Sequence, residues 1–231
     1  MKCLLCNSPT ESLGCVDLSR GCLGDRPALG EDIEYCRCLS CGLIFAPEMC
    51  AWMPDKFKRR IYNDAYPEVD PECTGMRAER NAAWMHDLFG AQRLSHLDFG
   101  GGDGHLSACL RKLGWDSTSY DPFHEQVFPQ RRFDLVTAFE VFEHVPDPIT
   151  LWQQLRVLTK DIVLFSTVLS DAVPDPMQWW YLAPRNGHVV LYTKRAAEQL
   201  LARGGFKLIS IDDFVHIGYR GVPPWLEAAI T

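Results

Sequence analysis

Residues 94–104 (LSHLDFGGGDG) contain the residue types that let a backbone approach a ligand closely. Four glycines occupy the five positions from Gly100 to Gly104, so the chain can adopt positive φ and meet a ligand without an intervening Cβ. A short, partly apolar segment precedes them, and leucines at helical spacing follow up to Gly114. The pattern predicts a strand ending at Phe99, a glycine turn, and a helix whose first N–H groups face a ligand.

The spacing of these glycines narrows the choice of ligand. A dinucleotide fingerprint, G-x-G-x-x-G, counted from Gly100 would require glycine where the chain has His105. The pattern present is Asp98-x-Gly100-x-Gly102-x-Gly104, which resembles motif I of the class I S-adenosylmethionine (SAM)-dependent methyltransferases. This resemblance implies that SAM lies across the turn, whereas the alternative is an ordinary tight turn between a strand and a helix.

A second carboxylate follows the next predicted strand. Residues 115–120 (WDSTSY) lead into Asp121, about 20 residues beyond the glycine turn, the distance at which an acidic side chain meets a ribose diol in nucleotide-binding folds. Because adjacent parallel strands end side by side, this carboxylate could accept hydrogen bonds from both ribose hydroxyls. An Asp-Pro turn is the other interpretation of Asp121.

The third feature is a strand followed by an acidic and histidine-bearing segment. Residues 133–139 (FDLVTAF) form a nearly continuous apolar run, which is typical of a central parallel strand covered on both faces. The following EVFEHVPDP resembles the segment after the fourth strand of small-molecule methyltransferases. The resemblance implies an α/β fold with a Rossmann-like, doubly wound methyltransferase sheet. It also implies cofactor contacts from Asp98, Gly100, Gly102, Gly104, Asp121, Phe139 and Glu140.

The chain departs from this family pattern after Asp121. Eleven residues, 122–132, stand where a doubly wound sheet would place a helix and a third strand, and they are too few for both. Either residues 126–128 form a very short third strand or the strand is lost. Phe123 and Phe128 are candidates to stack on the adenine ring.

Candidate catalytic residues follow from the needs of methyl transfer, which are in-line positioning and, where the acceptor keeps its proton, a base. Glu143 and His144 follow the predicted fourth strand and His188 lies in an aromatic loop; the ordinary pKa of histidine suits proton transfer. The alternatives are helix capping for the acidic residue and structural hydrogen bonding for the histidines. Tyr62 and Tyr66 are interpreted either as an active-site wall or as packing aromatics.

The rest of the pattern completes an α/β domain. Helices are predicted over residues 77–89, 149–159 and 194–203, the last with Thr193 as N-cap, and a buried strand over 161–169. Residues 206–214 and 215–220 are expected to form a closing antiparallel pair, as in the family that the chain resembles. The aromatic and proline-rich residues 174–188 indicate a substrate lid or pocket wall, with a dimer contact as the alternative.

Cysteines mark a separate N-terminal module, because eight of the ten lie in the first fifty residues. Cys3-x-x-Cys6 and Cys38-x-x-Cys41 are two knuckles whose four thiolates suit a tetrahedral Zn²⁺ ion, structural because no coordination position stays open. Cys36 is an alternative ligand, although only Cys38 keeps the two-residue spacing with Cys41. With the turn and strand at residues 42–45, the module resembles a zinc ribbon.

Bulk properties bound the function. The 231 residues carry a net charge of −7, which disfavours nucleic acid as a partner. No apolar segment approaches the roughly 20 residues of a membrane span, so a cytoplasmic location without membrane association is expected. The predicted division is a zinc-ribbon-like module at 1–50, a helical linker or lid at 51–90 and a SAM-binding methyltransferase domain at 91–231.

The sequence thus predicts a SAM-dependent methyltransferase of a small-molecule acceptor with a structural zinc ion. One alternative is an RNA or protein methyltransferase that uses the zinc module for recognition, and another is a non-catalytic SAM-binding module. The acceptor atom and the oligomeric state stay open.

Overall fold

The computed structural model describes residues 1–90, 94–124, 127–222 and 226. The chain forms two compact units. The first, called here the N-terminal unit, comprises Met1–Pro71, Phe142–Leu151 and Thr167–Leu200; the second, called the sheet unit, comprises Glu72–Val141, Trp152–Ser166 and Leu201–Thr231. The three-part division expected from the sequence stays a prediction.

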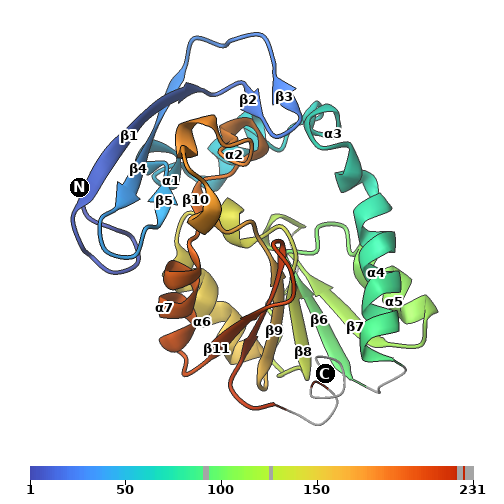
Figure 1. Ribbon diagram of the computed structural model, residues 1–231. Coiled ribbons are helices and arrows are strands. Elements are labelled where there is room, and N and C mark those ends of the chain that lie inside the picture. The colour runs from blue at the N-terminus through green and yellow to red at the C-terminus, as the bar shows by residue number, and fades with distance from the viewer. Residues whose placement is uncertain (91–93, 125–126, 223–225, 227–231) are drawn as a thin grey trace. The chain divides into compact units, whose positions relative to one another are not determined.

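The sheet unit contains a six-stranded sheet in the order β11-β12-β9-β8-β6-β7 (Figure 1). Its strands are β6 (Ser95–Phe99), β7 (Asp116–Tyr120), β8 (Leu135–Ala138), β9 (Ile162–Ser166), β11 (Lys207–Ser210) and β12 (Val215–Tyr219). The first four are parallel to one another, and β12 pairs antiparallel with both β9 and β11. This confirms the Rossmann-like α/β sheet and the closing antiparallel pair.

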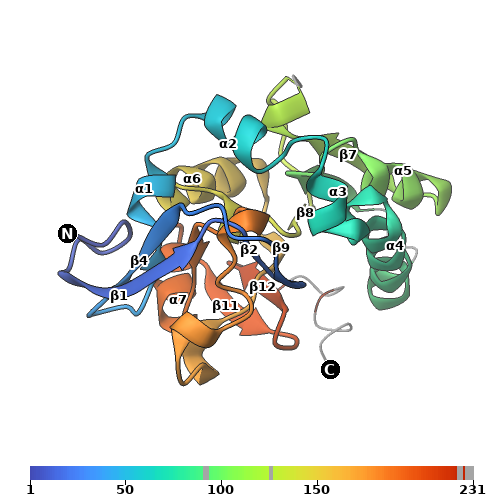
Figure 2. The same cartoon turned by 90° about the horizontal axis from the view of Figure 1, so that it is seen from above.

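Helices α4 (Met76–Phe89) and α5 (His105–Lys112) pack side by side in the sheet unit, as Figures 1 and 2 both show. The expected apolar stripe of α4 is buried through Ala82, Met85 and Phe89. It meets the apolar face of α5 and side chains of the central strands in one core cluster. All residues of β8 and β9 are buried, as the apolar runs in the sequence predict.

Within the described residues, the sheet ends at β7. After Asp121 comes only a short 3-10 helix, η2 (Pro122–His124), and neither Val127 nor Phe128 belongs to a strand. Gln126 lies outside the described residues. The strand that a full doubly wound sheet would place beyond β7 is therefore missing from the described part of this segment, in keeping with its length.

The N-terminal unit is built on a four-stranded antiparallel sheet in the order β1-β4-β5-β10. Its strands are β1 (Thr10–Asp17), β4 (Asp32–Cys38), β5 (Ile44–Phe45) and β10 (Val190–Leu191), and Figure 2 shows β1 and β4 running side by side. A second small pair is formed by β2 (Arg20–Gly21) and β3 (Gly24–Asp25). Short helices follow at α1 (Pro47–Cys50), α2 (Pro54–Arg60) and α3 (Tyr66–Val69).

The aromatic segment at residues 174–188 has an exposed first part, in which Trp180 is 48% exposed, and a buried second part that lies in the interior of the N-terminal unit. Every residue from Tyr181 to Tyr192 is buried, and β10 extends the four-stranded sheet by pairing with β5. Two 3-10 helices lie within the segment, η5 (Pro176–Gln178) and η6 (Pro184–Asn186). The burial of residues 181–188 favours a wall over a loose lid for this part of the segment.

The chain also forms the helices α6 (Pro148–Leu158) and α7 (Lys194–Ala202). The hydroxyl of Thr193 accepts a hydrogen bond from the N–H of Ala196 at 3.0 Å, which confirms the predicted N-cap of α7. Among the described residues, no helix combines the length and apolar character needed to cross a membrane.

Candidate functional site

The glycine turn between β6 and α5 requires glycine for more than one reason. Gly100, Gly102 and Gly104 have φ of +75°, +55° and +83°, in the left-handed region that other residues rarely adopt. A Cβ on Gly100 would also lie 2.5 Å from Cγ2 of Val141, whereas no described atom lies within 4 Å of a Cβ on Gly102. The backbone at Gly102 is therefore the part of the turn that a ligand can approach.

Gly101 is a further position of the turn at which only glycine fits, and the glycine spacing did not predict it. A Cβ there would lie 2.2 Å from Oδ2 of Asp98 and 2.5 Å from Oγ of Ser119. Both distances are far below van der Waals contact, so only glycine lets these side chains pack against the turn. The signal was present as an unbroken run of three glycines, of which motif I explains only alternate positions.

Asp98 lies beneath the turn within a buried polar chain. Its Oδ1 accepts a hydrogen bond from the Thr137 hydroxyl at 3.0 Å, and burial raises the pKa of Asp98 to about 7. The fully buried His96 stands between Thr137 and Ser117, with its Nε2 and Nδ1 at 2.9 and 2.8 Å from their hydroxyl oxygens. Asp98 is thus held in place by Thr137 on one side, and its other carboxylate oxygen packs against Gly101 of the turn.

Asp121 directly follows β7, as predicted, and both of its carboxylate oxygens are engaged. Oδ2 accepts the N–H of Gly102 at 2.9 Å, and Oδ1 accepts the N–H of Phe123 at 2.7 Å. The second bond is the Asp-Pro turn that the sequence offered as an alternative. A carboxylate oxygen has more than one acceptor site, so these bonds leave capacity for ribose hydroxyls.

The end of β8 carries the last two predicted cofactor residues. Phe139 packs against the apolar core of the sheet unit. Glu140 has φ of +53°, an unusual value for a residue other than glycine, of the kind that collects at functional sites. Its Oε1 accepts the Ser166 hydroxyl at 2.7 Å and its N–H donates to Oγ of Ser166 at 2.8 Å, so Ser166 fixes this conformation.

The two candidate adenine contacts differ in exposure and packing. Phe123 is 39% exposed, whereas the ring of Phe128 packs edge-on against Tyr120 with centroids 5.3 Å apart. Phe123 therefore offers the more accessible face for stacking.

The four predicted zinc ligands come together in the N-terminal unit. Sγ of Cys3 and Sγ of Cys41 are 3.7 Å apart, and Sγ of Cys6 lies 3.4 Å from Sγ of Cys38 and 3.7 Å from Sγ of Cys41. A tetrahedron with Zn–S bonds of 2.3 Å has sulfur atoms about 3.8 Å apart, so the donor set fits Zn²⁺. Cys36, the alternative ligand, does not belong to this cluster.

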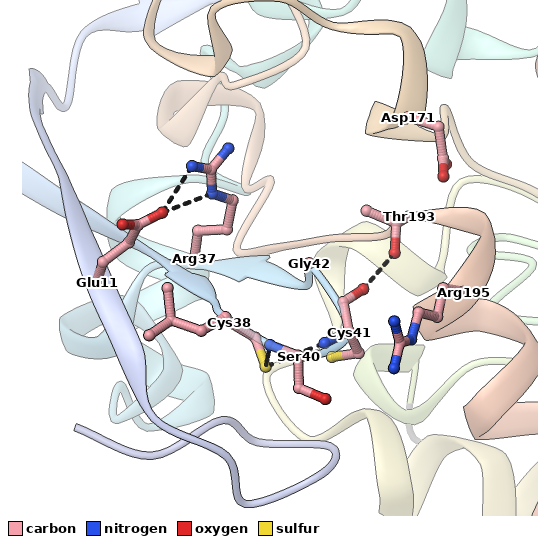
Figure 3. A pocket seen from close by; sticks show the side chains of 10 residues that line it. Glu11, Arg37, Cys38, Ser40, Cys41, Gly42, Asp171, Thr193 and Arg195 are labelled. Carbon is pink, nitrogen blue, oxygen red and sulfur yellow. Dashed lines mark hydrogen bonds and ion pairs between the residues drawn. The ribbon is translucent and has the colours of Figure 1, made fainter.

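Backbone contacts hold the second knuckle in shape. The N–H groups of Ser40 and Cys41 both point to Sγ of Cys38 at 3.4 Å, an arrangement that stabilises a thiolate. The Thr193 hydroxyl donates to the carbonyl of Cys41 at 2.5 Å. Figure 3 shows this contact as a dashed line. Thr193, which caps α7, thus also stabilises the conformation of the second knuckle.

The three candidate catalytic residues also form one cluster in the N-terminal unit. Glu143 and His144 lie in the 3-10 helix η3 (Phe142–His144), and each of these residues and His188 offers a ligand atom within 4.8 Å of the others. Glu143 is fully buried and its Oε1 accepts the Tyr181 hydroxyl at 2.7 Å. Nε2 of His144 lies 3.9 Å from the same Oε1.

Backbone carbonyls set the tautomers of the two histidines. Nδ1 of His188 is 2.7 Å from the carbonyl oxygen of Tyr181, and Nδ1 of His144 is 3.1 Å from that of Gly187. A carbonyl oxygen only accepts, so each Nδ1 carries the proton and each neutral ring has its lone pair on Nε2. Tyr181 was missed as an individual residue, although it stood in the aromatic segment that the sequence singled out.

The two predicted wall tyrosines lie next to this cluster. The Tyr62 hydroxyl is 3.1 Å from Nδ1 of His144, and the Tyr66 hydroxyl donates to the carbonyl of Asn186 at 3.2 Å. Their rings meet edge-on with centroids 5.2 Å apart. Tyr62 therefore contacts the candidate catalytic residue His144, while Tyr66 packs against the ring of Tyr62.

Comparison with known proteins gives a family match and structural similarities. Residues 75–211 match a family described as a methyltransferase domain. No curated protein sequence matches the chain. The family match covers the glycine turn, Asp121, and the cluster of Glu143, His144 and His188.

Several solved structures are similar. An O-methyltransferase family protein from Burkholderia thailandensis is 14% identical, with 76% of this chain and 67% of that chain covered and a TM-score of 0.53. Human N-acetylserotonin methyltransferase, solved with SAM, is 14% identical over 73% of this chain and 59% of that chain, with a TM-score of 0.52. Magnesium protoporphyrin IX methyltransferase from Synechocystis PCC 6803 is 16% identical over 72% and 93% of the two chains, with a TM-score of 0.47. At these identities the likeness concerns the fold.

Proposed function

The chain belongs to the methyltransferase-domain family, whose match at residues 75–211 spans more than half of its 231 residues, and we propose that it methylates a small-molecule acceptor. SAM is the methyl donor that goes with this family and fold. The human enzyme of the same fold was solved with SAM, and the porphyrin enzyme carries a small-molecule acceptor in its name.

The glycine turn and Asp121 are proposed to hold the cofactor. Gly102 presents open backbone, and Asp121 already binds the N–H of Gly102, so the turn and the carboxylate form one preorganised surface. Asp98 packs against Gly101 and is proposed to stabilise the conformation of the turn. Phe139 and Glu140 stay proposed contacts, with Glu140 held in a strained conformation by Ser166.

The cluster of Glu143, His144 and His188 is proposed to activate the acceptor, and this cluster is the observation that carries the proposal. Both imidazoles place Nδ1 at a backbone carbonyl, so Nε2 is the nitrogen that would exchange a proton with the acceptor, and the buried Glu143 side chain stands beside them. Such a group can receive or orient the acceptor's proton while the acceptor attacks the methyl carbon opposite to sulfur. SAM, when bound, would supply the methyl group and be released as S-adenosylhomocysteine.

The Cys₄ cluster is proposed to bind Zn²⁺ as a structural ion. Four thiolates fill a tetrahedral ion completely, so the ion supplies folding energy to the N-terminal unit and no reactive position. A role of this unit in recognising RNA would require a basic surface, which the net charge of −7 does not favour.

The test uses the purified chain with SAM labelled in its methyl group and a metabolite extract divided by mass. Label is expected in the low-mass fraction, and His144→Ala is expected to reduce its incorporation at least 100-fold without loss of SAM binding. Label appearing only in RNA or protein would overturn the proposed acceptor class. SAM binding without turnover on any fraction would instead support the non-catalytic alternative.

A further inference from the structure

The cluster of Glu143, His144 and His188 has the composition of a metal site as well as that of an acid–base group. One carboxylate and two imidazoles are the donor set that open-sided sites for divalent transition metals use. Their candidate ligand atoms lie within 4.8 Å of one another. Donors about 2.1 Å from an ion stand roughly 3–3.5 Å apart, so the cluster would have to contract by about 1 Å to enclose one.

The contacts around the cluster are those that metal ligands need. Both histidines donate Nδ1–H to a backbone carbonyl, at 2.7 Å for His188 and 3.1 Å for His144. This fixes the tautomer that presents Nε2 as the ligand atom and orients the ring. The Tyr181 hydroxyl donates to Oε1 of Glu143 at 2.7 Å and so orients the carboxylate in the same way.

The burial of Glu143 also favours a metal ion at this cluster. The Glu143 side chain is fully buried, and a buried carboxylate is stabilised by a cation that it can coordinate. The His144 side chain retains 15% of its exposure, which leaves one side of the cluster accessible. A further ligand could therefore reach the cluster at His144, and three protein ligands leave coordination positions on a metal ion for it.

We propose that Glu143, His144 and His188 bind one divalent transition metal ion, separate from the ion of the Cys₄ cluster. The remaining positions of the ion would take oxygen atoms of the acceptor, so the acceptor class narrows to molecules that present a hydroxyl or carboxylate oxygen. This inference refines the proposed function of the cluster, because the charge of the ion then favours the deprotonated acceptor, whose proton passes to solvent.

The experiment measures Mn²⁺ binding by electron paramagnetic resonance in protein loaded with one equivalent of zinc, without SAM or acceptor. Zinc keeps the four thiolates occupied, and Mn²⁺ prefers oxygen and nitrogen donors, so the signal reports on the second site. The wild-type chain is expected to bind one Mn²⁺. His188→Ala and Glu143→Gln are expected to weaken binding at least 10-fold, and Tyr181→Phe to weaken it measurably.

Two controls keep the result decisive. Glu143→Gln retains the volume and an acceptor for Tyr181, so its unfolding temperature shows whether the fold is intact. His124→Ala removes an exposed histidine of η2 and is expected to leave Mn²⁺ binding unchanged. Absence of binding by Mn²⁺, and by Co²⁺ or Zn²⁺ beyond the Cys₄ ion, would overturn the inference, as would equal affinity in wild type and both ligand variants.

The outcome for the ion is distinguishable from that for the acceptor. Methyl transfer that continues undiminished after the second ion is removed would leave the proposed function standing and overturn the inferred role of the ion in binding the acceptor. Mn²⁺ binding that depends on Glu143 and His188, in a chain that methylates only macromolecules, would support the metal site and overturn the small-molecule proposal.

Discussion

Asp121 accepts a hydrogen bond from the backbone N–H of Gly102, with 2.9 Å between oxygen and nitrogen. The carboxylate after β7 is therefore joined to the turn after β6. Two neighbouring parallel strands thus deliver one surface, in which the glycine backbone and the acidic side chain already have a fixed relation. A cofactor that binds both would meet a site that needs little rearrangement.

Replacing Asp121 with alanine is expected to weaken SAM binding about 10- to 100-fold, because hydrogen bonds to a charged group contribute about 1.5–3 kcal/mol. Isothermal titration with SAM and S-adenosylhomocysteine measures the loss. Asp116→Asn is the control, since Asp116 begins the strand that Asp121 follows but is exposed beside Arg131. Equal affinity in Asp121→Ala and wild type would remove the ribose assignment.

Gly101→Ala is expected to damage the turn more than Gly102→Ala. The added methyl group at 101 would meet Asp98 and Ser119 at 2.2 and 2.5 Å, whereas at 102 it meets no described atom within 4 Å and the penalty is that of positive φ. That penalty is about 1 kcal/mol, and the clash should exceed it by a further 1–3 kcal/mol. Urea unfolding of both variants compares them; the reverse order would show that Asp98 does not press against the turn.

Local features explain how much of the sheet unit was predictable. The glycine turn, the apolar run of β8 and the capping residue Thr193 are each encoded within a few residues, so the sequence places them to within one or two positions. The alternation of buried and exposed residues in β4 was also present in the sequence, but the cysteine spacing drew the interpretation away from it. β1 and β4 were consequently not predicted as a long antiparallel pair.

Contacts between distant segments were beyond sequence reasoning. The pairing of β10 with β5 and the hydrogen bond from Tyr181 to Glu143 each join segments that no local pattern relates. The same holds for the two compact units, each assembled from three stretches of chain. The sequence named Glu143, His144 and His188 as candidates, but only the folded chain shows that they meet.

The acid stability of the sheet unit is expected to reflect two buried groups with opposite effects. Burial lowers the pKa of His96 to about 3, so below pH 6.5 the unfolded chain takes up a proton that the folded chain does not, and stability falls with decreasing pH. Burial raises the pKa of Asp98 to about 7, so between pH 7 and 4 the folded chain holds the extra proton and stability rises with decreasing pH.

Each of these two contributions should amount to about 1.4 kcal/mol per pH unit, and in the wild type they largely offset each other between pH 6.5 and 4. His96→Gln removes the group whose protonation in the unfolded chain lowers stability in acid. The unfolding free energy of this variant should therefore rise on acidification relative to wild type. Asp98→Asn removes the group whose protonation in the folded chain raises stability in acid. The unfolding free energy of this variant should therefore fall on acidification relative to wild type. Parallel pH profiles of the two variants, measured by urea unfolding, would contradict the burial of one or both groups.

Loss of the Cys₄ ion is expected to unfold the N-terminal unit, because four thiolates brought together without an ion have lost their main stabilising partner. Cys38→Ser should abolish the sulfur-to-metal charge-transfer band of the Co²⁺-substituted chain and lower its thermal stability. Cys36→Ser is the matched control: Cys36 is buried on the same strand but stands outside the cluster, so the band should persist. The band depends on thiolate ligands and is therefore silent to an ion at Glu143, His144 and His188. Loss of the band in Cys36→Ser, with retention of the band in Cys38→Ser, would show that Cys36 and not Cys38 is the metal ligand.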